Sequence, residues 1–133
     1  MAHPDLMTSI PLGPFAARDA RHRVVDQLDS PSPDLRDAVQ LLTSELVTRA
    51  VGQCESPFGR RTAELRAWMS RDVVRVELEG PPGVDISPRP DGHCDFELML
   101  LEQVADRWSG EDAPACSGVW FEIDRGVQGG VVL

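Results

Sequence analysis

The 133-residue sequence lacks the features that would place it in a membrane or in an oxidising compartment. No apolar run approaches the roughly 18 residues that a membrane-spanning helix needs. The first residues, MAHPDLMTSIPLGPF, contain no basic segment followed by an apolar one, so we expect no signal peptide. The three cysteines (Cys54, Cys94 and Cys116) are widely spaced and form no C-x-x-C pair, which argues against a disulfide framework. We therefore expect a cytoplasmic protein.

Basic residues are also scarce. The sequence has 13 Lys and Arg against 22 Asp and Glu, which gives a formal net charge of −9. Nonspecific binding to nucleic acid or to an acidic membrane requires clustered Lys and Arg, so we expect neither partner. A protein partner with a basic surface suits this charge better. The length and the hydrophobic content of 41% indicate one globular domain, with a core over about 8–124 and a flexible tail over 125–133.

Hydrophobic periodicity predicts the element order β-α-α-β-β-α-β. Alternating apolar residues in TAELRAWM and VVRVELEG, joined by a short connection, predict a β-hairpin. The Pro- and Gly-rich segment 80–95 is expected to be a long loop. Antiparallel strands with one apolar face each predict an α+β two-layer sandwich, with helices on one face of the sheet. The other expected elements are an edge strand over 8–12, helices over 15–28, 35–51 (capped by Asp34) and 96–108 (capped by Asp95), and a strand over 117–124.

Two groups of side chains are candidates for contact with a partner. Arg18, Arg21 and Arg23 belong to the first predicted helix, together with His22, and form either a solvated face or a docking face for an acidic partner. Trp68 and Trp120 occupy outward positions of their strands. They either cover the sheet or form an exposed patch for homodimerisation or partner docking.

Several segments together resemble one protein family. TSELVTRAV, residues 43–51, resembles the N-box helix of the anti-sigma-factor serine kinases of the GHKL (histidine-kinase-like) ATPase superfamily, whose actinobacterial members typically have S-E-L-V-T-N-A-V there. FAARDARHRVV resembles the first helix of that family, VVRVELEG the strand before the adenine-binding box, and LLEQVADRWSG with GVWFEI the closing helix and strand. The resemblance covers about residues 8–123 and implies a GHKL-type sandwich whose relatives are commonly dimeric.

The nucleotide-binding positions implied by this resemblance depart from the family pattern. Arg49 replaces the asparagine that binds Mg²⁺, and Gly80 replaces the aspartate that accepts the adenine amino group, with Glu79 beside it. The lid segment GHCDFEL has one glycine, Gly92, where relatives have a glycine-rich motif. Mg²⁺ requires oxygen ligands and a guanidinium has no acceptor atom, so Arg49 cannot ligate the metal. We therefore expect neither ATP nor Mg²⁺ as a cofactor, although Glu45, the general base in the family, is present.

Glu45 and Arg49 are one helical turn apart, in the order that favours an intrahelical ion pair. Arg49 falls inside the apolar arc of the predicted helix and Glu45 at its edge. We therefore interpret the two side chains as a partly buried ion pair that is retained for packing rather than for chemistry.

The sequence supports the hypothesis of a regulatory protein that resembles anti-sigma factors and binds a sigma factor or an anti-anti-sigma-type protein. The first helix and the segment around 85–97 are the expected contact surfaces. The alternative is an active ATP-dependent serine/threonine kinase, with Glu45 as the base and Arg49 contacting phosphate. A third hypothesis is a structural subunit that pairs with an intact paralogue. Asp91, His93, Cys94 and Asp95 lack the spacing of a zinc site, so no metal is expected.

Overall fold

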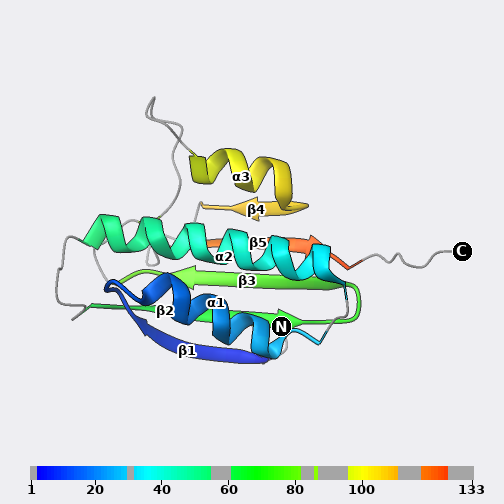
Figure 1. Cartoon of the computed structure of the whole chain (residues 1–133), viewed down its shortest axis with the longest axis horizontal. Helices are drawn as coiled ribbons and strands as arrows, with labels where there is room; N and C mark the ends of the chain where they lie inside the picture. The colour runs from blue at the N-terminus through cyan, green and yellow to red at the C-terminus, as the bar shows by residue number, and fades with distance from the viewer. Residues whose placement is uncertain are drawn as a thin grey trace, which may run out of the picture.

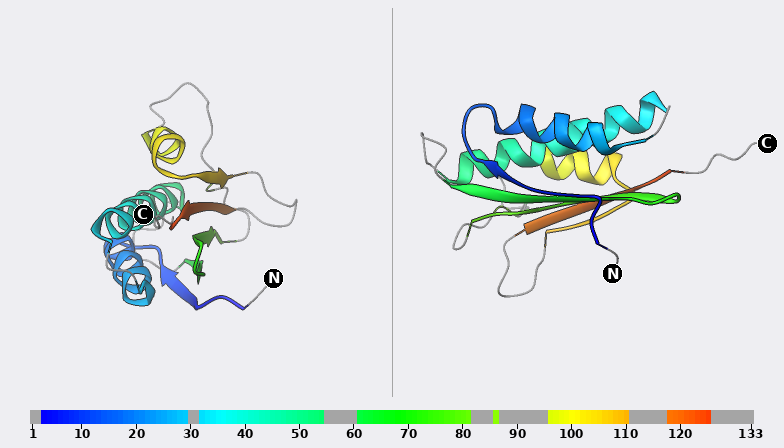
Figure 2. Two further views of the ribbon diagram at one scale, coloured as in Figure 1. Left: turned by 90° about the vertical axis from the view of Figure 1, so that its right-hand side faces the viewer. Right: turned by 90° about the horizontal axis from the view of Figure 1, so that it is seen from below.

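A computed structural model of the chain describes residues 3–29, 32–54, 61–81, 86, 96–110 and 118–125. The strands form one five-stranded sheet in the order β1-β2-β3-β5-β4, and every neighbouring pair is antiparallel. The three helices lie on one face of this sheet (Figures 1 and 2). The predicted α+β two-layer class is therefore confirmed. The elements are β1 (Leu6–Pro11), α1 (Ala16–Gln27), α2 (Pro33–Cys54), β2 (Thr62–Met69), β3 (Val73–Glu79), α3 (Phe96–Val104), β4 (Arg107–Ser109) and β5 (Gly118–Asp124).

The core lies between the sheet and the helices. Alternate residues of β2, β3 and β5 face the helices and are buried, as the period-2 pattern predicts. Phe121 on β5 has 0% exposure, and burial of a side chain of this size contributes about 1.5–3 kcal/mol. The predicted β2–β3 hairpin is confirmed and is closed by a hydrogen bond from Ser70 N to Val73 O. The buried strand residues are Ala63, Leu65, Ala67, Val74, Val76, Leu78, Val119, Phe121 and Ile123.

Helix α2 is the longest element and runs from Pro33 to Cys54, beyond the predicted end near residue 51. Its cap is Ser32 rather than Asp34, because Ser32 Oγ accepts a hydrogen bond from the backbone N–H of Leu35. Pro33 then occupies the first helical position, where its missing N–H costs no hydrogen bond. Asp34 lies in the first turn instead, where its negative charge interacts favourably with the positive end of the helix dipole. None of the helices in the described ranges is long and apolar enough to span a bilayer.

Strand β4 was not predicted. The helix expected over 96–108 ends at Val104, and Arg107–Ser109 pairs with the outer edge of β5. The backbone N–H of Asp106 donates to Glu122 O, and the Asp106 carboxylate accepts from Asp124 N. These sheet hydrogen bonds replace the helical ones, and Trp108 packs against the core from the strand, opposite Phe121. The predicted cap Asp95 lies outside the described residues.

Arg125 fastens the end of β5 to two other segments. Its guanidinium donates to the carbonyl oxygens of Ser70 in the hairpin turn and Asp29 after α1, at 2.8 and 2.9 Å. Its backbone N–H donates to Asp72 O. The first residue of the predicted tail is thus tied to the fold, while 126–133 lie outside the described residues.

Candidate functional site

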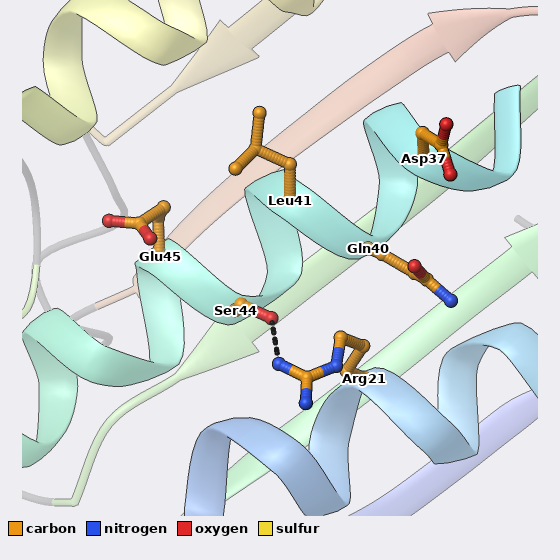
Figure 3. A pocket seen from close by; sticks show the side chains of 6 residues that line it. All are labelled: Arg21, Asp37, Gln40, Leu41, Ser44 and Glu45. Atoms are coloured by element: carbon orange, nitrogen blue, oxygen red, sulfur yellow. Dashed lines mark hydrogen bonds between the residues drawn. The ribbon is translucent and has the colours of Figure 1, made fainter. Parts of the chain in front are cut away.

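A shallow hollow of about 350 Å³ lies on the outer surface of the helical layer, away from the sheet. We call it the α1–α2 hollow. Helix α1 contributes one residue to it and α2 contributes the rest (Figure 3). The buried face of α2 is turned toward the sheet, so its polar and partly exposed residues are left to line this hollow. The lining residues are Arg21, Asp37, Gln40, Leu41, Ser44 and Glu45.

Arg21 joins the two helices at the hollow. Its guanidinium reaches from α1 to α2 and donates a hydrogen bond from Nη1 to Ser44 Oγ at 3.0 Å (Figure 3). The side chain is half-buried, so its methylene groups pack between the helices while its charged end stays near solvent. A guanidinium has five N–H donors, so the bond to Ser44 leaves it able to bind a further acceptor.

The outer ridge of α2 forms the other part of the hollow. Asp37, Leu41 and Glu45 are spaced four residues apart and therefore lie on one side of the helix. Leu41 is 40% exposed and lies between the two carboxylates on this ridge. Glu45 was a predicted site residue, whereas Asp37 and Leu41 were not predicted from the sequence. Their common spacing outside the apolar arc of α2 is the signal that could have identified them.

The three arginines of α1 do not share one surface. Arg21 points toward α2, whereas Arg23 donates to Thr8 Oγ1 on β1 at 2.9 Å and pairs with Asp19 at 3.8 Å. At about 100° per residue the two side chains leave the helix about 200° apart, so no single flat partner surface can contact both. Arg18 is exposed on the outer side of the helix. Within the predicted docking face, only Arg21 belongs to the α1–α2 hollow.

Glu45 and Arg49 are both half-buried on α2, but the predicted ion pair between them is not formed. Within the described ranges, no ion pair links Glu45 to Arg49. Such an intrahelical pair contributes only about 0.2–0.5 kcal/mol, too little to fix two flexible side chains. Glu45 instead lines the α1–α2 hollow with Arg21 and Ser44, and Arg49 has an interaction of its own.

Gly80 is a predicted nucleotide position that the structure describes at the end of β3. Gly80 directly follows β3, and the side chain of its neighbour Glu79 accepts a hydrogen bond from Arg66 Nη2 at 3.1 Å. This places Glu79 on the face of the sheet opposite the helices, since the adjacent Leu78 is buried beneath them. Glu79 therefore cannot act as an acceptor for a ligand held against α2. Gly92 and most of the 80–95 loop lie outside the described residues.

The sheet face that carries no helix is covered by paired charges. We call it the open sheet face. Arg66, Arg75 and Arg107 cross the strands on this face, and each bonds to more than one carboxylate. Partial burial alone would lower the pKa of Arg66, but the hydrogen bonds that its guanidinium donates to Glu79 and Glu77 raise it. The carboxylates on this face are Glu64, Glu77, Glu79, Glu122 and Asp124.

Both tryptophans predicted to point outward lie half-buried on the open sheet face. The Arg75 guanidinium stacks over the Trp120 ring, 4.0 Å from its centroid. Trp68 is the residue before Met69, which ends β2, and it has an interaction of its own. The structure therefore places the Trp120 ring beneath an arginine that pairs with Glu77 and Glu122.

In the part of the chain that the structure describes, no group of three or more His, Cys, Asp or Glu side chains could hold a metal ion. His93 and Cys94 lie outside that part. Cys54, at the end of α2, is buried, and this burial raises the pKa of its thiol despite the opposing charge of Arg61.

Sequence comparison adds no closer identification. The resemblance to the anti-sigma-factor serine kinases rests on the segments quoted above and on their order along the chain. No protein-family model matches this sequence, and no curated protein is significantly similar to it.

Proposed function

We propose that the chain is a regulatory protein resembling anti-sigma factors, which acts by binding a protein partner and does not bind Mg·ATP. The partner is a sigma factor or an anti-anti-sigma-type protein, and both proteins meet in the cytoplasm. The resemblance places the metal-binding residue at position 49, and the arginine there is the observation that carries the proposal. A guanidinium offers no oxygen to Mg²⁺ and brings a positive charge to the metal position.

The geometry around β3 supports the same proposal. An adenine acceptor would have to lie on the helix side of the sheet, within reach of α2. Glu79, the carboxylate next to Gly80, is hydrogen-bonded to Arg66 on the open sheet face instead. Positions 49 and 80, which relatives use for Mg²⁺ and for adenine, are thus occupied by Arg49 and Gly80, and neither residue can perform that role.

The α1–α2 hollow supports partner binding on the helical layer. It brings Arg21, an expected contact residue, onto the same surface as Glu45. In an active kinase Glu45 would remove a proton from the partner's hydroxyl, which requires a bound phosphate donor nearby. Without nucleotide, the same carboxylate serves as a charged contact for a partner.

Calorimetry with Mg·ATP and a binding screen test this proposal together. The chain is titrated with Mg·ATP to millimolar concentration. It is then presented to the purified sigma factors and anti-anti-sigma-type proteins encoded in the same genome, by biolayer interferometry with and without nucleotide. We expect no heat of binding for Mg·ATP and a partner affinity that nucleotide leaves unchanged. Saturable Mg·ATP binding, with phosphoryl transfer to the partner that Glu45→Ala abolishes, would establish the kinase instead.

A further inference from the structure

We propose that the α1–α2 hollow binds a helical segment of the partner that carries two basic residues two turns apart with an apolar residue midway between them. This inference rests on the proposed function, because it specifies the partner chemistry for the same surface. It follows from the spacing, exposure and charge of the residues that line the hollow.

The spacing along α2 defines the length of the segment. Asp37 and Glu45 are eight residues apart, which corresponds to about 12 Å along the helix axis at 1.5 Å per residue. Leu41 lies midway between them on the same ridge. A second helix packed beside α2 repeats its residues with the same rise. Two basic residues at positions i and i+8, with an apolar residue at i+4, therefore match the ridge in register.

The exposure of Leu41 indicates what the midpoint of the segment contributes. Its side chain is 40% exposed although the helix has a full buried face elsewhere. An apolar side chain from the partner would remove this surface from water, which favours association. The flanking carboxylates would exclude an apolar partner that lacks basic residues, because their charges would lose hydration without compensation.

The charges of the lining residues indicate that the bound segment is basic. Neither Asp37 nor Glu45 takes part in an ion pair with another described residue. The carboxylates of the open sheet face differ in this respect, because Arg66, Arg75 and Arg107 already pair with them. Asp37 and Glu45 on the helical layer thus carry charges that no described ion pair neutralises. The net charge of −9 further attracts a basic segment and speeds its association.

Arg21 determines which side of the partner segment faces α1. It lies on the α1 side of the hollow and is held there by Ser44. An acidic side chain of the partner can bind the remaining guanidinium donors, provided that it faces α1 while the basic residues face α2. The lining as a whole carries one more negative than positive charge, so the basic contacts dominate.

A titration followed by NMR tests the proposal with a defined probe. The probe is an Ala-rich helical peptide of 18 residues with Lys at positions i and i+8 and Leu at i+4. A second peptide of the same composition has its lysines on the opposite face. We expect the first peptide to shift the amide signals of Leu41, Ser44 and Glu45 saturably, and the second to have little effect.

A matched pair of variants links the binding to the carboxylates. Asp37→Asn with Glu45→Gln should weaken the first peptide about three- to tenfold, the effect expected from two exposed ion pairs. Asp26→Asn with Glu102→Gln changes the net charge equally, at exposed positions of α1 and α3, and should leave the affinity unchanged. Thermal melts of all variants confirm that each remains folded.

Equal binding of the two peptides, equal weakening by the two pairs of variants, or shifts on the open sheet face would each overturn the inference. The peptide experiment contains no nucleotide. Its failure is therefore distinguishable from failure of the proposed function, which depends on the Mg·ATP titration. A regulatory partner that binds the Asp37→Asn/Glu45→Gln chain normally would likewise refute the inference while leaving the proposed function intact.

Discussion

Arg75 on β3 lies over the ring of Trp120 on β5, with its guanidinium carbon 4.0 Å from the ring centroid. The same guanidinium pairs with Glu77 on its own strand at 2.7 Å and with Glu122 on β5 at 2.8 Å. One side chain thus covers an aromatic ring and joins two neighbouring carboxylates. On the open sheet face, such contacts perform the covering role that the helices perform on the other face.

Replacing Arg75 should therefore lower stability more than replacing an exposed arginine. Arg75→Ala removes the stacking on Trp120 and leaves Glu77 and Glu122 less well compensated, with an expected loss of about 1–3 kcal/mol in the free energy of unfolding. Urea unfolding measures the loss. Arg71→Ala, at an exposed position of the hairpin turn, is the control and should change stability by less than about 0.5 kcal/mol. Equal effects of the two variants would contradict the covering role of Arg75.

The decrease in the free energy of unfolding at acid pH, here called the acid limb, should depend on Glu122. Partial burial alone would raise the pKa of this carboxyl, but hydrogen bonds from Arg107 and Arg75 outweigh it and lower the pKa below the usual value. A carboxyl with a lowered folded-state pKa contributes stability above its unfolded pKa, near 4.3 for glutamate, and loses it as the pH falls through the folded value.

Urea unfolding from pH 7 to pH 2.5 should show a decline below about pH 4.3 that is smaller in Glu122→Gln. The variant should also be less stable than the natural chain at pH 7, because the pairing with Arg107 and Arg75 is lost. Glu102→Gln, at an exposed position of α3, is the matched control and should keep the full decline. An unchanged acid limb in Glu122→Gln would show that other groups cause the decline.

The sequence predicted the elements whose pattern depends on their own residues. The alternation in β2, β3 and β5 identified their buried faces, because a half-buried strand must alternate. Strand β4 was missed because its three residues have no pattern of their own, and only the free edge of β5 makes them a strand. Ser32 was missed as the cap of α2 because both Ser32 and Asp34 are good capping residues.

The site was predicted less completely than the fold. Arg21 and Glu45 were predicted as separate site residues, and the packing of α1 against α2 places them in one hollow. Spacing along one helix cannot show which residue of another helix lies beside it. The expected Glu45–Arg49 pair failed for a related reason, since favourable spacing permits an ion pair without requiring it.

Close packing between β3 and β5 should make position 118 sensitive to any side chain. A Cβ at Gly118 would lie 2.8 Å from the carbonyl oxygen of Leu78, and this backbone atom cannot move aside without separating the strands. Gly118→Ala should therefore cost about 1–3 kcal/mol in the free energy of unfolding. The control is Gly52→Ala in α2, where nothing lies within 4 Å and the helix should gain about 0.5–1 kcal/mol. Thermal or urea unfolding of both variants gives the comparison, and a neutral Gly118→Ala would contradict the packing.

Replacing Arg49 with the asparagine of the kinases that the sequence resembles should not create nucleotide binding. Arg49→Asn supplies an amide oxygen suited to Mg²⁺, but Glu79 still points to the open sheet face and Gly80 still offers no carboxylate for adenine. Calorimetric titration of Arg49→Asn with Mg·ATP to millimolar concentration should therefore show no saturable heat. Arg49→Asn combined with Gly80→Asp replaces both positions and is the informative second variant. Binding by Arg49→Asn alone would mean that one residue blocks an otherwise competent site, and binding that appears only in the double variant would mean that the adenine position is limiting as well.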